Sequence, residues 1–328
     1  MKFLWCLLLA AAMPAYGQTD YISLRMLTYN IQHGAGTDNV VDLDRQAEVI
    51  RNVDADVVGL QEVDSVVRRS DRVYQAGYLA QTLGMHATFG PAIPLTGGKY
   101  GVAILSKEAP ISVRNIPLPG AEARTLLVCE FQEYVFACTH LDLEEENRLA
   151  SLPIIIEEAS RHVKPFFICG DWNDKPSSTL IKTMKQDFQI LNSVTAVNSS
   201  YTFPASKPTT LIDYIASYGK VVKAVRSRRV INAPSQSDHR PVMVEVVLEP
   251  LATGIKEMQS STDPLTPFRG NEVGNGKDPL NPFGSNEMVN GQWSNGQWYD
   301  MSGKRVSATR PKPGLYIESS GRRKVAVL

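Results

Sequence analysis

Five strand-like stretches of this chain each end in a short polar motif, and this arrangement constrains the fold more than any other feature. The motifs are Thr28-Tyr29-Asn30, Gln61-Glu62-Val63-Asp64, Thr139-His140-Leu141-Asp142, Gly170-Asp171-Trp172-Asn173 and Ser237-Asp238-His239-Arg240-Pro241. Most of them follow an apolar run, such as Val57-Val58-Gly59-Leu60. A buried strand that ends in a carboxylate, amide or imidazole is a common way for an α/β protein to assemble an active site. Five such strand ends in order indicate a metal-assisted hydrolase.

Strand-like and helix-like segments alternate between residues 21 and 249. Strands are expected at 24–31, 56–63, 86–93, 101–106, 124–131, 134–140, 166–170, 211–216, 221–230 and 240–248, and helices at 43–53, 74–83, 144–163 and 177–187. Pro153 is expected either to bend the third helix or to mark where it begins. Strands joined by both hairpins and helices predict an α/β fold in which two mixed β-sheets pack together with helices outside.

The segment after residue 249 differs in composition. Residues 250–290 contain a Pro/Gly/Asn-rich unit twice, starting at Asp263 and again 15 residues later at Asp278. Two polar copies are too few for a solenoid, so an extended linker is expected. Residues 291–328 carry several short strand-like runs and are expected to form a small β appendage, which leaves residues 21–249 as the catalytic domain.

The N-terminus has the pattern of a secretory signal peptide. Lys2 precedes an apolar run over residues 3–13, and Ala15-Tyr16-Gly17 provides a small-x-small cleavage site. Residues 1–17 are therefore expected to be removed, which predicts a periplasmic, cell-surface or extracellular protein. No stretch of the chain reaches the roughly 20 apolar residues that a transmembrane helix needs.

Charge and cysteine content limit the partners of the mature chain. Lys plus Arg and Asp plus Glu both number 34, so the zero net charge does not indicate a nucleic-acid-binding protein, although a local basic patch would be compatible with it. Loss of Cys6 leaves Cys129, Cys138 and Cys169, which cannot all pair within one molecule. Cys129 and Cys138 lie on neighbouring strands, where they would either form a disulfide or be buried as small hydrophobic side chains.

Glu62 and Asp238 are the first candidate metal ligands. A hard divalent cation such as Mg²⁺ binds oxygen ligands and keeps several waters, so one or two carboxylates are sufficient. Asn30 could join this set, orient one of the carboxylates or contact a substrate phosphate. A single Glu or Asn at a strand end also serves to cap a loop, so the assignment depends on the motifs occurring together.

The other motifs carry groups suited to water activation and proton transfer. Asp171 and Asn173 lie two residues apart after a buried strand and could together position a water molecule. The same Gly-Asp-x-Asn pattern also occurs in ordinary turns. Asp213 could pair with His239 and make that imidazole an acid, a base or an electrostatic clamp. His140 could assist on the leaving-group side.

The remaining basic side chains have weaker motif support. Arg124 heads the strand that contains Cys129 and could contact a phosphate oxygen. Arg68, Arg69 and Arg72 follow the Glu62 strand and are expected in a solvated basic loop. The histidines without a motif, which are expected to be ordinary residues, are His33, His86 and His162.

The ordered set of motifs resembles the endonuclease/exonuclease/phosphatase superfamily, which includes deoxyribonuclease I, the abasic-site endonucleases and the neutral sphingomyelinases. The resemblance covers roughly residues 23–248. The segments that carry it are Leu27-Thr28-Tyr29-Asn30-Ile31, Leu60-Gln61-Glu62-Val63, Tyr100-Gly101-Val102-Ala103-Ile104-Leu105-Ser106, Thr139-His140-Leu141, Gly170-Asp171-Trp172-Asn173, Ile212-Asp213-Tyr214-Ile215 and Ser237-Asp238-His239-Arg240-Pro241.

This resemblance implies a four-layer α/β sandwich and Mg²⁺- or Mn²⁺-dependent cleavage of phosphate esters. It implies that Glu62 is the main metal ligand and that Asn30 and Asp238 lie nearby. It implies that Asp171 and Asn173 orient the attacking water molecule. The same resemblance implies that Asp213 and His239 form a general base or phosphate clamp, with His140 on the leaving group. One departure is Trp172, where Phe or Leu is usual, and this side chain is expected to pack beneath its motif.

The C-terminal tail is similar to the sorting domains of the Bacteroidetes type IX secretion route, through Tyr299 to Val306 and Pro313 to Ile317. Together the motifs predict a secreted, monomeric metal-dependent phosphoesterase, in particular a phosphodiesterase that uses in-line attack by water. The alternatives are a nuclease acting on DNA or RNA, a sphingomyelinase, an inositol-phosphate phosphatase, or a surface binding protein on an inactive hydrolase scaffold.

Overall fold

The computed structural model describes residues 21–193, 195 and 197–248, together with the backbone of four short strands after residue 297. The expected signal peptide at 1–17 and linker at 250–290 lie outside the described residues. The chain divides into two compact units, Met1–Lys256 and Glu257–Leu328.

The first six-stranded sheet has the order β11-β12-β1-β2-β4-β3. Its strands are β1 (Ile22–Asn30), β2 (Val57–Ser65), β3 (His86–Leu95), β4 (Gly98–Ser106), β11 (Ala224–Val230) and β12 (Val242–Leu248). β1 and β2 are parallel, whereas the other neighbouring strands are antiparallel. The sheet is therefore mixed, as the sequence predicts.

The second six-stranded sheet has the order β5-β6-β7-β8-β10-β9. Its strands are β5 (Ser112–Leu118), β6 (Arg124–Glu130), β7 (Val135–His140), β8 (Phe166–Asp171), β9 (Phe188–Ile190) and β10 (Asp213–Tyr218). β7 and β8 are its parallel pair. Two strands, β5 and β9, are absent from the sequence-based prediction. Both lie at sheet edges, where β5 is largely exposed and β9 spans only three residues, so neither produces a clear apolar pattern.

Four α-helices accompany these sheets in the described part of the chain. They are α1 (Leu43–Val53), α2 (Gln75–Leu83), α3 (Glu145–Ser160) and α4 (Thr179–Asp187), and there are two 3₁₀ turns, η1 (Gln32–Gly34) and η2 (Arg68–Ser70). Side-chain caps begin two of them, since Asp42 accepts from the first turn of α1 and Ser178 accepts from Ile181 N. Pro153 lies inside α3, so the alternative that it marks the helix start is wrong. The helix instead begins on Glu145 and Glu146, whose charges suit its N-terminus.

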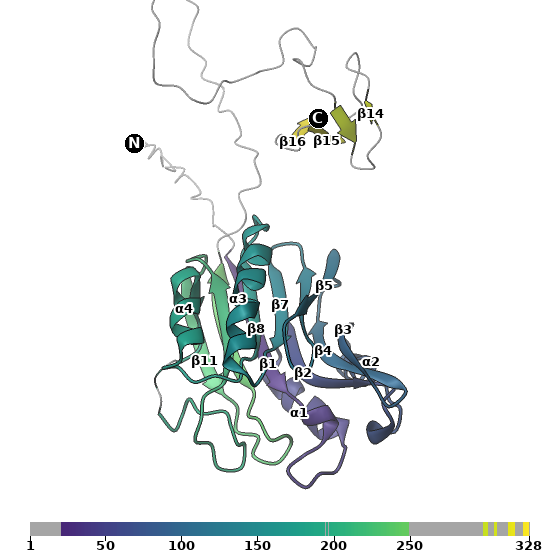
Figure 1. Ribbon diagram of the computed structural model, residues 1–328, viewed down its shortest axis with the longest axis vertical. Helices are drawn as coiled ribbons and strands as arrows, with labels where there is room; N and C mark the ends of the chain where they lie inside the picture. Colours follow the sequence, from purple (N-terminus) through teal and green to yellow (C-terminus); the bar gives the residue numbers. More distant parts are fainter. Residues whose placement is uncertain are drawn as a thin grey trace, which may run out of the picture. The chain divides into compact units, whose positions relative to one another are not determined.

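Three apolar layers hold the elements together. One cluster fills the space between the two sheets, a second joins the first sheet to α1 and α2, and a third joins the second sheet to α3 and α4. Figure 1 shows the resulting order of helices, sheet, sheet and helices. This arrangement confirms the four-layer α/β sandwich. Trp172 is fully buried in the third cluster, where it stacks on Tyr214.

The cysteines of the catalytic unit are thiols in the core. Cys129, Cys138 and Cys169 are all free and buried, so the alternative of a Cys129–Cys138 disulfide is not realised. Two of them approach Gly59 in β2 across the sheet interface. A Cβ atom at position 59 would lie 2.1 Å from Sγ of Cys169 and 3.1 Å from Sγ of Cys138. Glycine at this position therefore allows the two sheets to pack closely.

We expect Gly59→Ala to lower the free energy of unfolding by about 1–3 kcal/mol, because the added methyl group overpacks the interface. Urea denaturation would measure the loss. The Gly59→Ala/Cys169→Ala double variant removes the sulfur atom nearest to the new methyl group, so it should lose less than the sum of the two single losses. Strictly additive losses would show that the two positions do not compete for space.

The C-terminal unit contains a separate four-stranded antiparallel sheet of order β14-β13-β15-β16. Its strands are β13 (Trp298–Asp300), β14 (Arg305–Val306), β15 (Gly314–Glu318) and β16 (Lys324–Val327). The similarity of this unit to a sorting domain stays a prediction. Within the described residues, no helix combines the length and the apolar character that crossing a membrane would require.

Candidate active site

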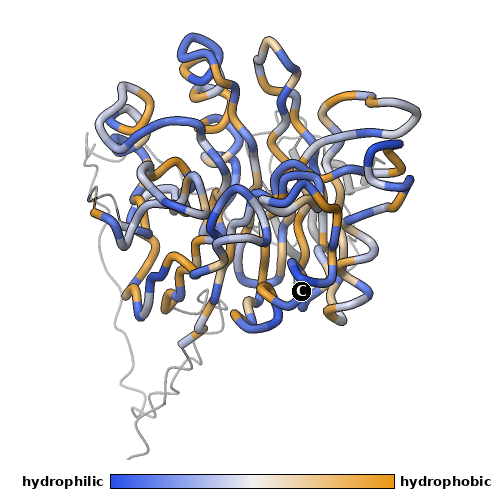
Figure 2. Tube along the Cα trace, turned by 90° about the horizontal axis from the view of Figure 1, so that it is seen from below, coloured by the Kyte–Doolittle hydropathy of each residue, from blue (hydrophilic) through white to orange (hydrophobic). Residues whose placement is uncertain are grey.

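The polar motifs meet at one end of the sandwich. Asn30 ends β1, His140 ends β7 and Asp171 ends β8, and each of these strands has a parallel neighbour that ends at the same edge. This end is opposite to the one where Ile22 pairs with Leu248. It is the lower end in Figure 1 and faces the viewer in Figure 2, where hydrophilic loops surround more hydrophobic segments.

Asn30 links the two sheets at the centre of this end. Its Nδ2 donates to Oε1 of Glu62 at 3.1 Å and to Oδ2 of Asp171 at 3.2 Å. Its Oδ1 accepts from Gln32 N at 3.1 Å, which fixes the orientation of the amide. The carbonyl of Asn30 accepts from Oγ of Ser237 at 2.7 Å, so the loop that carries His239 is also attached here.

A β-bulge directs Glu62 toward this centre. The register between β2 and β4 shifts between Leu60 and Val63, and Glu62 has a φ of 57°, which is unusual for a residue other than glycine. Burial raises the pKa of the Glu62 carboxyl, and the charges of Asp238 and Asp171 raise it further, whereas the hydrogen bond from Asn30 lowers it. The site therefore concentrates negative charge around Glu62.

Asp171 is the meeting point of both imidazoles. Its Oδ2 lies 3.5 Å from Nε2 of His239 and 3.6 Å from Nε2 of His140. Its Oδ1 accepts from Asn173 N at 2.9 Å, and Asn173 has a φ of 51° that asparagine tolerates well. The side chain of Asn173 also donates to Leu141 O at 2.9 Å, which joins the β7 and β8 motifs.

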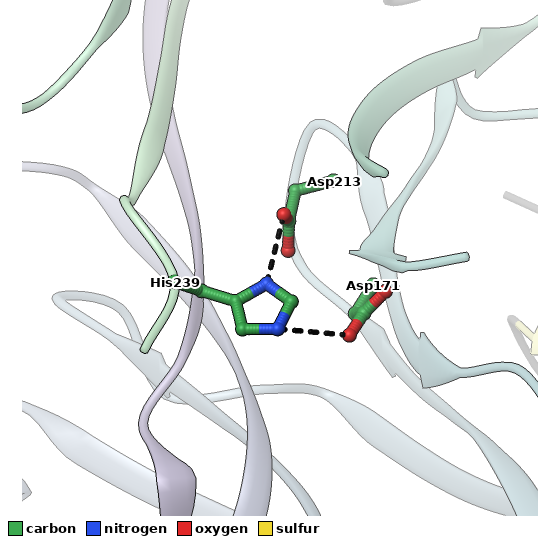
Figure 3. A group of neighbouring side chains, drawn as sticks. All are labelled: Asp171, Asp213 and His239. Atoms are coloured by element: carbon green, nitrogen blue, oxygen red, sulfur yellow. Dashed lines mark hydrogen bonds and ion pairs between the residues drawn. The ribbon is translucent and has the colours of Figure 1, made fainter. Parts of the chain in front are cut away.

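His239 lies between two buried carboxylates, as Figure 3 shows. Its Nδ1 is 3.0 Å from Oδ2 of Asp213, and its Nε2 faces Asp171. Burial disfavours the charged ring, but the charges of Asp213 and Asp171 outweigh it and raise the pKa of His239 to about 10. In the metal-free protein this side chain is therefore an imidazolium at neutral pH.

His140 has the opposite electrostatic environment. Its Nδ1 lies 3.3 Å from Nη1 of Arg124, which can only donate, so Nδ1 must accept and the ring proton lies on Nε2. Burial lowers the pKa of His140 to about 4; Asp171 opposes this change, whereas the charges of Arg124 and His239 add to it. At neutral pH, the His140 ring that faces Asp171 is therefore uncharged.

We expect the two imidazoles of the metal-free protein to titrate far apart. At pH 7 both nitrogens of His239 should carry protons, and its signals should change only near pH 10. His140 should stay neutral until the pH falls to about 4. Long-range ¹H–¹⁵N correlation spectra recorded in EDTA from pH 4 to 10 would measure both transitions. Two transitions close to the ordinary value of 6.5 would contradict this electrostatic description.

These shifts have opposite consequences for stability. The pKa of His140 is lower in the folded state than in the unfolded state, so its contribution to stability is lost as the pH falls from about 6.5 to about 4. The pKa of His239 is higher in the folded state, so its contribution is complete below about 6.5 and is lost as the pH rises through about 10. The combined contribution of His140 and His239 to the free energy of unfolding should therefore be largest near pH 6.5 in the metal-free protein.

The other two sequence-predicted residues lie beside this centre. Asp238 is half-buried, and its Oδ1 lies 3.3 Å from Oγ of Ser237. Arg124 is buried and forms ion pairs with Glu122 at 3.2 Å and Asp142 at 3.6 Å, in addition to its contact with His140. The structure thus brings all nine predicted residues to one end of the molecule, with Arg124 directed at His140.

Several residues that contact the site were not predicted. Phe203 packs against the ring of His239 with centroids 4.8 Å apart, although it comes from a loop without any motif. Arg68, Arg69 and Arg72 are exposed, as expected. Arg69 also pairs with the fully buried Asp64 at 2.9 Å and lies over the ring of Tyr100. Asp64 ends the Gln61-Glu62-Val63-Asp64 motif, so the sequence already contained an acid that could pair with Arg69.

The chemistry of the site fits a divalent cation. Asp171, Asp213 and His239 offer ligand atoms within 4.8 Å of one another, but both nitrogens of His239 face carboxylates and its ring is cationic, so it is a poor ligand. Glu62, Asp171 and Asp238 instead form a group of carboxylates: burial raises the pKa of Glu62, and the charges of Asp238 and Asp171 raise it further. Such an all-oxygen set matches the preference of Mg²⁺ or Mn²⁺.

A two-sheet sandwich with acids, amides and imidazoles at one end defines a class of metal-assisted hydrolases. A match to the family model described as "Endonuclease/Exonuclease/phosphatase family" covers residues 27–239. The chain belongs to this family, whose members hydrolyse phosphate esters, and is therefore a hydrolase acting on phosphate ester bonds. Enzymes of this family typically depend on divalent metal ions.

Solved structures show the same fold. A family member from Bacteroides vulgatus has 22% sequence identity and a TM-score of 0.58, with 70% of this chain and 100% of that chain covered. ANGEL2, a 2′,3′-cyclic phosphatase, has 18% identity and a TM-score of 0.53, covering 70% and 96%. A mannosyl-6-phosphatase of Bacteroides thetaiotaomicron has 17% identity and a TM-score of 0.53, covering 69% and 100%. No curated protein matched the chain.

Proposed function

We propose that this protein is a Mg²⁺- or Mn²⁺-dependent phosphodiesterase that uses water to cleave a phosphodiester. The observation that carries the proposal is the position of Asp171, whose Oδ2 accepts a hydrogen bond from Asn30 and faces Nε2 of both His140 and His239. One carboxylate oxygen thus lies among an amide donor, a neutral imidazole and an imidazolium. This set can bind a phosphate group and a water molecule together.

Glu62 would hold the cation, with Asp238 and Asp171 as its nearest additional carboxylates. A bound divalent cation would supply charge stabilisation of the phosphoryl oxygens in the transition state. Asn30 acts as a positioning residue in this proposal, because its NH₂ group faces Glu62 while its oxygen is occupied by Gln32 N. The orientation of its amide thus favours this role over direct metal ligation.

The remaining residues would bind the phosphate and transfer protons. His239, held as an imidazolium by Asp213, is suited to clamp a phosphoryl oxygen. His140 is fixed by Arg124 as a neutral donor through Nε2. Asp171 would accept a proton from the attacking water, while Asn173 helps to position that water. A new P–O bond forms to the water oxygen and the P–O bond to the alcohol breaks. The leaving oxygen would take up the proton that Asp171 removed from the water, giving a phosphate monoester and an alcohol.

Hydrolysis by the full chain would test this proposal. Bis-p-nitrophenyl phosphate and p-nitrophenyl phosphate would compare a diester with a monoester, each with Mg²⁺, Mn²⁺ or EDTA. Plasmid DNA, sphingomyelin and inositol phosphates would be assayed in parallel. We expect metal-dependent turnover with a preference for the diester. A folded, metal-loaded protein that turns over none of these compounds would contradict the proposal and favour a binding protein on an inactive scaffold.

A phosphatase acting on a monoester is the second candidate. The mannosyl-6-phosphatase of Bacteroides thetaiotaomicron, which shares this fold, supports this candidate. ANGEL2 is a 2′,3′-cyclic phosphatase, and a cyclic phosphate is a diester, so that structure supports the first candidate. The comparison of diester with monoester separates the two candidates directly. Preferential release of inorganic phosphate from p-nitrophenyl phosphate would assign the phosphatase function.

We also propose that the protein is exported as a monomer. The signal-peptide pattern at residues 1–17 and the tail that is similar to a sorting domain support export. N-terminal sequencing of protein recovered from cell envelope and culture fluid should begin at Gln18. A protein that keeps Met1 and stays with the cytosolic fraction would contradict export, and gel filtration would test the monomer.

A further inference from the structure

A buried arginine, Arg148, lies between the loops that carry His140 and Asp171. It is the fourth residue of α3, where the cation opposes the dipole of the helix. Burial of a charged side chain is costly unless hydrogen bonds and an opposite charge surround it. The position of Arg148 therefore requires specific partners.

Arg148 finds these partners in both loops. Side chains near a helix N-terminus point back along the chain, so its Nη1 donates to Asp142 O at 3.1 Å and to Leu143 O. Its Nε donates to Oδ2 of Asp174 at 3.1 Å, and this contact is also an ion pair. One planar guanidinium thus ties the loop after β7 to the loop after β8.

The contacts of Arg148 lie beyond the last bonds that join the ends of these two strands. His140 pairs with Asp171 in the parallel ladder, and Leu141 N donates to Asp171 O at 3.0 Å. The side chain of Asn173 donates to Leu141 O at 2.9 Å. After these residues one loop leads into α3 and the other leads toward α4. Arg148 therefore holds the loops together where the sheet no longer does.

On the β7 side, Arg148 fixes the loop whose carboxylate holds Arg124. Oδ2 of Asp142 pairs with Nε of Arg124 at 3.6 Å, and within the described residues this nitrogen has no hydrogen bond. Nη1 of Arg124 in turn contacts Nδ1 of His140 at 3.3 Å. Because the ion pair is already long, a small displacement of the Asp142 loop would weaken it. The orientation of the His140 ring thus depends on Arg148.

On the β8 side, Arg148 fixes the turn that contains Asn173. Asp174 directly follows Asn173, and its backbone oxygen accepts from Oη of Tyr214 at 2.8 Å. Arg148 and Tyr214 thus hold Asp174 through its side chain and its backbone. The same turn lets Asn173 N donate to Oδ1 of Asp171 at 2.9 Å.

We propose that Arg148 is a positioning residue that sets the His140 ring against Asp171 and Asn173. Its effect on catalysis rests on the proposed phosphodiesterase function. Without this tie, the donor near the leaving group and the residues that hold the attacking water would move independently. A displacement of about 1 Å is sufficient to slow a reaction by about 10²-fold.

Steady-state kinetics of the full-chain variant Arg148→Lys would test this role, because lysine keeps the charge but cannot form the same fork of hydrogen bonds. We expect kcat for bis-p-nitrophenyl phosphate to fall by about tenfold, with an unchanged KM. The loss should be larger for diphenyl phosphate. Phenolate leaves less readily than p-nitrophenolate, so its departure depends more on a donor at the leaving oxygen. A smaller folded fraction alone would lower both rates by the same factor.

Long-range ¹H–¹⁵N correlation spectra in EDTA give a readout that does not depend on turnover. In the wild type the proton of the His140 ring lies on Nε2. In Arg148→Lys, the ring signals should shift toward those of a mixture of both tautomers. Asp174→Ala removes the partner on the β8 side and should reproduce the kinetic and spectral changes.

Arg161→Lys is the matched control, because it makes the same substitution at the other end of α3, where Arg161 pairs with Glu157 and Glu158. This variant should match the wild type in both measurements.

A folded Arg148→Lys variant with the wild-type tautomer and the wild-type kcat would overturn the proposal. Equal losses with both diesters and an unchanged tautomer would also overturn it, because they indicate a purely structural role. If Arg148→Lys does not fold, Asp174→Ala decides by the same criteria. If the wild type hydrolyses neither diester while the tautomer still changes in Arg148→Lys, only the phosphodiesterase function is contradicted.

Discussion

Glu62→Gln is expected to reduce kcat by about 10³-fold, because it removes the carboxylate best placed to hold the cation. The substitution should not destabilise the metal-free protein. Burial and neighbouring acids raise the pKa of Glu62, so the ionised group is costly in the folded state and a neutral amide relieves that cost. We therefore expect the urea midpoint in EDTA to be equal to or higher than that of the wild type.

Glu133→Gln is a matched control for this prediction, because Glu133 is a half-buried residue of the turn between β6 and β7, away from the polar motifs. It should leave kcat, metal affinity and stability unchanged. Titration of Mn²⁺ followed by electron paramagnetic resonance would measure metal binding directly. Wild-type turnover or wild-type Mn²⁺ affinity in Glu62→Gln would remove Glu62 from the proposed metal site.

His239→Gln is expected to reduce kcat by about 10²–10⁴-fold, because the cationic clamp on the phosphoryl group is lost. Unlike the Glu62 substitution, it should also destabilise the protein. Asp213 is buried, its Oδ2 contacts His239 and its Oδ1 has no hydrogen-bond partner. Loss of the imidazolium would leave that carboxylate uncompensated, at a cost of roughly 3 kcal/mol in the free energy of unfolding.

A double variant separates the two effects of His239→Gln. Asp213→Asn/His239→Gln removes the uncompensated charge, so it should recover stability without recovering turnover. His86→Gln provides a control, because His86 is exposed at the start of β3. If the double variant is as unstable as His239→Gln, then charge burial is not the source of the loss.

Much of the candidate site could be predicted from the sequence, because its residues directly follow strands that are buried and apolar. Asn30, His140 and Asp171 each end such a strand, and their proximity follows from the parallel neighbours of those strands. The two-sheet sandwich could be predicted for the same reason, since buried strands carry a strong apolar signal.

The interactions that tune the site could not be predicted in this way. The contact of Arg124 with His140 depends on the register of β6 against β7, which places Leu126 opposite Thr139. The stacking of Phe203 on His239 depends on the path of a long loop. Both arise from tertiary packing, and neither leaves a periodic pattern in the chain.

Asn30, Glu62 and His239 come from the first sheet or its loops, whereas His140, Asp171 and Asp213 come from the second. Either sheet alone would hold only part of the candidate site. During refolding, strand formation within each sheet should restore the far-ultraviolet circular dichroism signal without restoring turnover. Recovery of activity would then report the moment at which the two sheets dock, and its rate would be the docking rate.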